Sequence, residues 1–492
     1  MDRNIKERLE LALRPVEKPT LEEVLEQVSR RGVLRGPVDW VFPAWMLYVE
    51  YATQEIMKTF PLSEEEKRQL LDFRDAMKRL LLEAWVQAKE KLTALYKAVA
   101  EGMYRVEGDK IYAPNGTWMY VRKGFTSHII IRGVGASTYF PNILKLPRER
   151  LELLQLGWRA SDEGNGKSRP FMGTAQPWQV FAWAAVRYGK LHIYIASVNL
   201  TREGISIQVY SKTKSWRQRW NKNEAIDLVA SHLKRGEWAP LLTAWLGDGS
   251  VDRKKVLHSD YKIVVAAKEP WRLSNIVSKD RAIVATGKEA FVKLREAAGV
   301  YGMLLDLLKA HKWIIVKLAT DDGFRAAYKL KTRKRSIDRL REAYRQNNGE
   351  IPTAQGLQRN VAKRRREKPR KDTIAVADIK MTLQLMKGKN ILLIARRYVC
   401  DVGRALAIAE RLESAGLKPN VVPSDSCYMV YIATADLLRL AERDGEIRRA
   451  IALYLAEKAK NGTPRQREIA EELLKRIPFS INAFLLPRSW RR

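Results

Sequence analysis

The segment LLTAWLGDG, residues 241–249, combines a compact helix with an acid at its end. Pro240 suits the first turn of such a helix, because that position leaves its backbone N–H unpaired in any case. Thr243 and Gly247 are four residues apart, so they share one helix face and allow a second backbone to approach closely. We therefore predict a tightly packed helix that holds the Asp248 carboxylate at its end, a ligand type that Mg²⁺ prefers.

The residues after Asp248 alternate between two periodicities. A period of two is typical of strands, and a period near 3.6 is typical of helices. Strands are predicted at 251–258, 261–268, 313–320 and 324–331, and helices at 239–248, 288–308 and 336–345. The Asp321–Gly323 segment is predicted to be a hairpin turn.

This pattern resembles the signature helix and core unit of LAGLIDADG homing endonucleases. The matching positions are Leu241, Thr243, Trp245, Gly247, Asp248 and Gly249. In that family, two signature helices pack together, each supplies one acid to a metal, and the sheets form a saddle over the DNA major groove. The resemblance implies that Asp248 is a catalytic Mg²⁺ ligand. It also implies that Lys329 or Lys331, on the predicted fourth strand, assists the reacting water or contacts phosphate.

A single-chain enzyme of this kind needs a second helix that carries an acid. Segment 437–445 places Arg439 and Arg443 where small residues are required, so we reject it. Segment 341–349 has Asn348 in place of the acid. Three alternatives follow: a homodimer formed through the one good helix, a single weakened half-site, or a protein that binds without cutting.

The rest of the chain extends the prediction to an α+β protein, with a helical N-terminal region followed by αββαββα-type units. Apolar residues at three- and four-residue spacing predict an amphipathic helix or a helical hairpin from Ser63 to Val99. After it, strands are predicted at 116–124, 127–133, 191–199 and 205–213, and helices at 177–188 and 223–235. In the C-terminal third, strands are predicted at 374–383, 390–397, 420–424 and 427–433, with a helix at 402–415 and further helices to the end. The predicted domains are a helical region at 1–102, a Trp-rich α+β unit at 103–236, a LAGLIDADG-like unit at 237–349, a basic linker at 350–371 and a C-terminal α+β unit with a helical tail at 372–492.

The Trp-rich unit carries a second resemblance. The stretches WMYVRKG, QPWQVFAWAAVRYG and TAWLGDG are similar to the paralogous repeat proteins of Pyrobaculum-type crenarchaea. That family has no assigned activity to carry over. The resemblance implies an archaeal source and an association with a mobile or repeated genetic element.

The charge of the chain indicates a polyanionic partner. The 492 residues include 90 Lys and Arg against 56 Asp and Glu, a formal net charge of +34. Such a charge opposes compaction unless a polyanion binds, and nucleic acid is the commonest polyanion. The charged N-terminus and the absence of long apolar runs predict a cytoplasmic protein without a membrane partner. Cys400 and Cys427 show no pattern typical of a zinc site or a disulfide framework.

Several basic clusters are candidates for nucleic-acid contact. Segment 212–222, KTKSWRQRWNK, contains five basic residues, two tryptophans and no acid, which suits phosphate contact with stacking. The candidates are Lys212, Lys214, Trp216, Arg217, Arg219, Trp220, Lys262, Lys268, Arg325, Arg364, Arg365 and Arg366. Double-stranded DNA is the expected partner. Exposed Trp216 and Trp220 rings would favour RNA instead, whereas buried rings would make them a core pair.

Together these features predict a DNA-binding protein that is a Mg²⁺-dependent homing-type DNA endonuclease or a degenerate relative of one. The alternative is a DNA- or RNA-binding protein without catalysis.

Overall fold

The computed structural model describes residues 2–121, 127–250, 253–257, 261–266, 282–346, 372–386, 392–424 and 427–476. The chain divides into two compact units, Met1–Ala326 and Ala327–Arg492. Both are mixtures of helices and antiparallel sheets, so the expected α+β class is confirmed. No helix within the described ranges is both long enough and apolar enough to cross a membrane.

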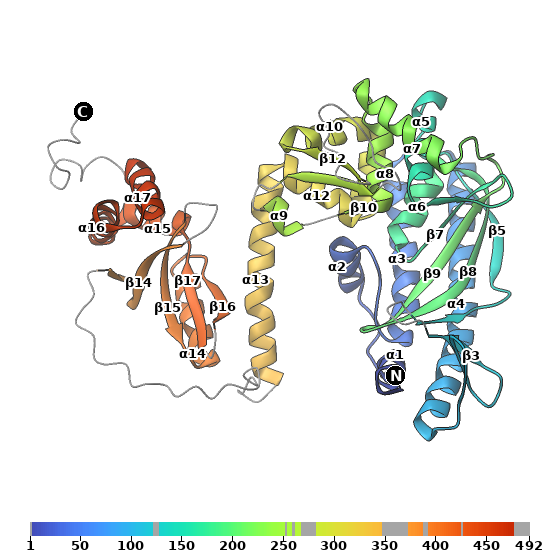
Figure 1. Cartoon of the computed structure of the whole chain (residues 1–492), viewed down its shortest axis with the longest axis horizontal. Coiled ribbons are helices and arrows are strands. Elements are labelled where there is room, and N and C mark those ends of the chain that lie inside the picture. The colour runs from blue at the N-terminus through green and yellow to red at the C-terminus, as the bar shows by residue number, and fades with distance from the viewer. Residues whose placement is uncertain are drawn as a thin grey trace. The chain divides into compact units, whose positions relative to one another are not determined.

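Four helices open the first unit: α1 (Asp2–Leu13), α2 (Leu21–Arg31), α3 (Val38–Thr59) and α4 (Glu64–Glu101). Of the helix and the helical hairpin that the apolar spacing allowed, the structure shows the single helix α4. It begins at a capping box in which the Ser63 side chain accepts from the Glu66 backbone N–H and the Glu66 carboxylate accepts from the Ser63 N–H. Helices α1, α3 and α4 contact a large sheet (Figure 1).

The described part of the first unit contains a nine-stranded antiparallel sheet. The strand order is β1-β2-β3-β4-β8-β9-β7-β6, and β5 also pairs with β8. Its strands are β1 (Arg105–Glu107), β2 (Lys110–Tyr112), β3 (Trp118–Tyr120), β4 (Ser127–Ile130), β5 (Gly135–Phe140), β6 (Glu163–Asn165), β7 (Pro170–Thr174), β8 (Gly189–Thr201) and β9 (Gly204–Thr213). Side chains alternate between a buried face and a half-exposed face, as on β8, where Leu191 and Ile193 are buried while His192 and Tyr194 are half-exposed.

Helices α5 (Arg148–Ala160), α6 (Pro177–Val186) and α7 (Lys222–Lys234) alternate with the strands of this sheet. The order from α5 to α7 is α5-β6-β7-α6-β8-β9-α7, and these four strands are adjacent in the order β6-β7-β9-β8. The predicted strands at β8 and β9 and the helices at α6 and α7 are confirmed. Helix α5 and strands β6 and β7 were not predicted.

The next region differs from its predicted order. It contains α8 (Ala239–Asp248), β10 (Gly249–Ser250), α9 (Arg253–Leu257), β11 (Lys262–Ala266), β12 (Ala282–Thr286), α10 (Lys288–Ala298), α11 (Val300–Leu307), α12 (His311–Thr320) and α13 (Asp322–Gln346). The described strands form a short antiparallel sheet of order β10-β11-β12. The predictions of a helix at 239–248 and a strand at 261–268 are confirmed, whereas those of strands at 251–258, 313–320 and 324–331 are wrong.

These errors have physical causes. Helix α12 is buried on nearly all sides, so its apolar run carries no helical period that the sequence could show. In α13, Phe324 and Tyr328 are four residues apart among good helix formers such as Ala, Lys and Arg. The predicted hairpin turn at 321–323 is a junction between two helices, in which the Asp321 side chain accepts from the Phe324 backbone N–H at 2.8 Å.

The second unit contains β13 (Thr373–Val376), β14 (Ile379–Met386), β15 (Leu392–Val399), α14 (Val402–Ser414), β16 (Asn420–Ser424), β17 (Cys427–Ile432), α15 (Thr434–Arg443), α16 (Gly445–Asn461) and α17 (Pro464–Arg476). Its described strands form a sheet of order β13-β14-β15-β17-β16. The predicted strands at 390–397, 420–424 and 427–433 and the helix at 402–415 are confirmed, and further helices follow as far as Arg476. The single strand predicted at 374–383 is instead two strands, β13 and β14, because the chain turns at Ala377 and Asp378. Cys400 and Cys427 form a disulfide, which their spacing in the sequence did not indicate.

Candidate functional site: an acid pair beside an open sheet face

Helices α5 and α8 pack closely because small residues face each other at their contact. A Cβ atom added to Gly157 would lie 2.0 Å from the Pro240 carbonyl oxygen and 2.1 Å from Thr243 Oγ1. The Thr243 hydroxyl donates to the Leu154 carbonyl at 2.8 Å, which links the two helices directly. At the other end of the contact, a Cβ on Gly247 would lie 2.2 Å from Ser161 Oγ. The predicted close approach at Thr243 and Gly247 is therefore confirmed.

The two helices end in a pair of acids. Asp162 lies two residues beyond the end of α5, and Asp248 is the last residue of α8. Their carboxyl groups are hydrogen-bonded to each other. Burial, together with this hydrogen bond and the charge of Asp248, raises the pKa of Asp162 to about 6. We call Asp162 and Asp248 the acid pair; both come from one chain, so the pair needs no second copy.

The acid pair stands where two sheets approach each other. Asp162 directly precedes β6, the last strand in the order of the nine-stranded sheet, and Asp248 directly precedes β10, an edge of the short sheet. Asp162 is half-buried and Asp248 is exposed, so a ligand can reach the carboxylates from solvent.

A buried lysine lies against the acid pair. Lys312, on α12, is 6% exposed, and its Nζ donates to the carbonyl oxygens of Trp245, at 3.2 Å, and Gly247. These carbonyls lie at the C-terminus of α8, where the helix dipole attracts a cation. Burial lowers the pKa of Lys312 to about 8, and the negative charges of the acid pair oppose that decrease.

Further hydrogen bonds hold Asp162 in place. Gln179 Nε2 donates to Asp162 Oδ2 at 3.1 Å and to the Leu246 carbonyl at 3.2 Å. One side chain therefore links the segment after α5 to helix α8. The next residue, Glu163, forms a buried ion pair with Arg187 at 2.8 Å. Trp183 Nε1 also donates to Glu163 at 2.8 Å. The backbone that carries Asp162 is thereby fixed.

The donor set of the acid pair fits Mg²⁺. Two carboxylates at the ends of packed helices supply hard oxygen ligands, and a bound cation would offset the burial and the negative charge of Asp248 that raise the pKa of Asp162. The described part of the chain has no group of three or more His, Cys, Asp or Glu residues able to hold a metal. That is compatible with Mg²⁺, which typically takes one or two carboxylates and keeps several waters or phosphate oxygens.

The half-exposed face of the nine-stranded sheet is polar and aromatic. Tyr194 and Tyr210 stack across β8 and β9 with ring centroids 5.1 Å apart. Lys212 lies opposite His192 on the same face. Lys214, just beyond β9, donates to Ser137 on β5 at 3.4 Å. The structure therefore places Lys212 and Lys214 at one edge of this aromatic face.

The remaining candidates from segment 212–222 lie in the loop between β9 and α7. Trp216 is half-buried and donates its indole N–H to the Tyr188 carbonyl at 2.8 Å. Trp220 is also half-buried. Arg217 and Arg219 are exposed, and Arg219 pairs with Glu152. The two tryptophans are therefore neither a helical core pair nor fully exposed stacking rings.

Other sequence candidates are placed differently from expectation. Arg325 donates to the Leu318 and Ala319 carbonyls and so caps the C-terminus of α12 instead of lining a sheet. Lys329 and Lys331 lie on helix α13 in the second unit, so the strand expected to carry them to Asp248 does not exist. Lys262 is exposed on β11. Lys268, Arg364, Arg365 and Arg366 lie outside the described residues.

Sequence reasoning missed Asp162 and Lys312. The signal for Asp162 was present: Gly157 and Ser161 are four apart and are followed by an acid, the same spacing as Thr243, Gly247 and Asp248. It was overlooked because α5 itself was not recognised as a helix. Lys312 carried no such signal, since it lies on α12, most of which was predicted to be a strand at 313–320.

No family model, curated protein or solved structure matches this chain.

Proposed function

We propose that this chain is a LAGLIDADG-like protein that binds duplex DNA and cuts it with Mg²⁺ held by Asp162 and Asp248. The observation that carries the proposal is the acid pair itself. Two helices that meet through small residues bring one acid each to the same place, Asp248 at the end of α8 and Asp162 just after α5, and the two carboxyl groups are hydrogen-bonded. The resemblance at residues 241–249 requires two such helices, of which the sequence analysis identified only the one that carries Asp248.

The arrangement of elements also supports the proposal. The order α5-β6-β7-α6-β8-β9-α7 is one αββαββα unit, and α8 with β10–β12 is a shortened second one. Because each acid precedes the edge strand of one sheet, the open faces of both sheets would flank a duplex bound at the acid pair. Tyr194, Tyr210 and Lys212 would then lie along the duplex, where lysines contact phosphate.

Each group near the acid pair has a role in this proposal. Bound Mg²⁺ would activate a water and stabilise the charge that develops on a cleaved phosphate. The carboxylates of Asp162 and Asp248 hold the ion, and Gln179 orients Asp162. Lys312 is a positioning residue, because its buried ammonium ties down the end of α8 and offsets the repulsion between the two acids.

The second candidate is a DNA-binding protein without catalysis, and Lys312 favours it. A buried ammonium beside the two acids offsets much of their negative charge without any metal. The RNA alternative is weaker, because Trp216 is half-buried and its indole N–H is already bonded to the Tyr188 carbonyl.

A cleavage assay separates these functions. The full chain is incubated with supercoiled plasmid and with a randomised duplex pool, in Mg²⁺, Mn²⁺ or EDTA. We expect the wild-type chain to give nicked or linear products in Mg²⁺ or Mn²⁺ but not in EDTA. The variants Asp162→Asn and Asp248→Asn should give no products, although they should still bind the duplex. Asp227→Asn, at an exposed acid on α7, is the matched control and should cut normally.

Two other results have clear meanings. Cutting by both acid-pair variants at the normal rate would remove Asp162 and Asp248 from the chemistry. Salt-sensitive duplex binding with no cutting in any metal, and with no thermal stabilisation by Mg²⁺ or Mn²⁺, would establish the non-catalytic protein instead.

A further inference from the structure

Strands β2, β3 and β4 carry a row of half-exposed rings at the end of the sheet most distant in strand order from Asp162. The rings belong to Tyr112, Trp118, Tyr120 and His128, and the cations Arg105 and Lys110 accompany them. We call these six residues the Trp118 platform. Trp118 lies opposite Tyr112 in the register, and Tyr120 lies opposite both Lys110 and His128.

The platform has a defined geometry. The Trp118 and Tyr120 rings meet edge to face with centroids 4.8 Å apart, and Tyr120 and His128 stack at 4.7 Å with planes 30° apart. Lys110 Nζ lies 4.7 Å from the Trp118 centroid and 5.5 Å from that of Tyr120. The Arg105 guanidinium lies 5.2 Å from the Tyr112 centroid and is also paired with Glu107.

Core packing does not account for these rings. The residues between them, Ile111, Met119 and Ile129, point to the opposite face and are at most 4% exposed. That opposite face contains the hydrophobic contacts that hold the strands, whereas every ring of the platform remains half-exposed. A cluster of aromatic rings with cations poised over them, left partly open to solvent, is suited to a planar, anionic partner.

We propose that the Trp118 platform binds unpaired nucleic acid by stacking bases on its rings, with Arg105 and Lys110 near the phosphates. Every base has a π face, so such stacking needs no particular sequence. The charge of +34 makes a polyanion the favoured occupant over a neutral peptide or a second copy of this equally basic chain. The platform also continues the open face that carries Tyr194 and Tyr210.

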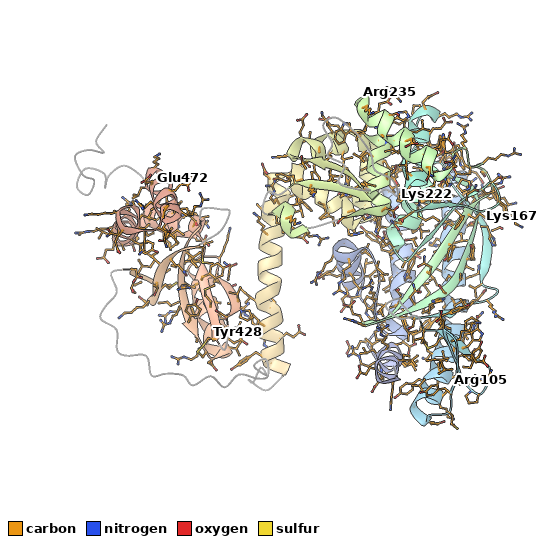
Figure 2. All side chains as sticks on the ribbon, in the orientation of Figure 1. Arg105, Lys167, Lys222, Arg235, Tyr428 and Glu472 are labelled. Carbon is orange, nitrogen blue, oxygen red and sulfur yellow. A yellow bond between two sulfur atoms is a disulfide. The ribbon has the colours of Figure 1, made fainter. Side chains whose placement is uncertain are left out.

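The position of the platform separates it from the acid pair. Five strand-to-strand steps, β3-β4-β8-β9-β7-β6, lie between Trp118 and the strand that follows Asp162. At roughly 4.8 Å per step, this is about 24 Å, or about seven nucleotides of strand. Figure 2 shows Arg105 well apart from Lys222, whose Nζ donates to the carbonyl of Ser161 beside Asp162. Binding at the platform therefore does not depend on cleavage or on metal at the acid pair.

The test measures binding of a labelled single strand, dT15, and of a hairpin duplex by the full chain in EDTA. We expect the double variant Trp118→Ala with Tyr120→Ala to weaken dT15 binding by about ten-fold or more, because each base–aromatic stack contributes substantially. Duplex binding should change by less than about three-fold, since most duplex contacts are to phosphate. Trp238→Ala, which removes another half-buried ring with a lysine (Lys293) near its face, is the control and should leave both affinities unchanged.

A second measurement does not require the variants to fold. Photocrosslinking of the wild-type chain to a bromouracil-substituted single strand should label peptides within residues 105–130. Wild-type dT15 affinity in a folded double variant, equal loss of dT15 and duplex binding, or crosslinks that exclude 105–130 would each overturn the proposal. A failure of the acid-pair variants to affect cleavage would leave it intact.

Discussion

Arg187 and Glu163 form an ion pair that is almost completely buried, with side-chain exposures of 2% and 0%. Removal of one partner leaves an uncompensated buried charge, which typically costs 3–5 kcal/mol. We expect Arg187→Met to lower the free energy of unfolding by about that amount. Chemical denaturation measures it. Arg219→Gln, which breaks an exposed pair with Glu152, should cost less than about 1 kcal/mol and is the control. Equal effects of the two substitutions would mean that Arg187 is not held as described.

Asp162 should make stability without metal depend on pH. Its pKa of about 6 is above the ordinary value of 3.8, so its stabilising contribution is complete below about pH 3.8 and is lost as pH rises through 6. At pH 7.5 the charged carboxylate is therefore unfavourable, and Asp162→Asn should raise the free energy of unfolding by up to about 3 kcal/mol. At pH 4 the substitution should have little effect.

Denaturation in EDTA at both pH values checks this sign. In Mg²⁺, the stability of the wild-type chain should instead increase as pH rises, because a bound cation favours the charged carboxylates. The thermal stabilisation by Mg²⁺ should accordingly grow between pH 5 and 7.5 and should vanish in Asp162→Asn. A variant that is equally less stable at both pH values would contradict the assignment.

At the scale of elements, the contact between α5 and α8 depends on the absence of side chains. We expect Gly157→Ala to destabilise the chain by about 1–3 kcal/mol, because its new methyl group would overlap the Pro240 carbonyl and the Thr243 hydroxyl. Overlap with backbone cannot be relieved by a rotamer change. Gly445→Ala is the matched control, since nothing lies within 4 Å of its added Cβ and its backbone conformation is ordinary. Thermal unfolding of both variants measures the difference, and equal melting temperatures would show that the helices do not approach this closely.

The same contact explains how much of the site the sequence could predict. Small residues at a spacing of four with an acid after them predicted the packing surface of α8, because that surface is determined by local periodicity. The identity of its partner depends on tertiary structure. Helix α5 contains Trp158 and Arg159 close to its end, and both are buried, which masks the usual division between apolar and polar faces.

Long-range burial limited the fold prediction in a similar way. Strands with one open face, such as β8 and β9, kept their alternation and were predicted correctly. Helix α12 is buried on nearly all sides and lost its period, so it was mistaken for a strand. Because α12 was mistaken for a strand, Lys312 was not recognised as part of the site. The interior tolerates the charge of Lys312 only because carbonyl and carboxylate groups surround it, and the sequence does not show where those groups lie.

At the scale of the whole molecule, one strand order occurs in both units. Strands β6-β7-β9-β8 of the first unit and β14-β15-β17-β16 of the second have the same order along the chain and across the sheet, with a helix between the second and third strand in each. Both sheets also keep one face partly open, with Tyr194 and Tyr210 in the first and Arg396 and Tyr398 in the second. Such open faces agree with the distribution of a large positive charge over the whole chain.

A net charge of +34 should therefore be visible in the salt dependence of duplex binding. Each phosphate that the chain neutralises adds about −0.9 to the slope of log affinity against log salt, so contacts to six or more phosphates predict a slope of about −5 or steeper. Fluorescence anisotropy between 50 and 300 mM KCl measures this slope. Lys212→Gln with Lys214→Gln should make it shallower by about two, because each lysine at the edge of the open face accounts for about one counterion. A slope near zero for the wild-type chain would mean that phosphate does not neutralise its charge, and the acid pair would then have no nucleic-acid substrate.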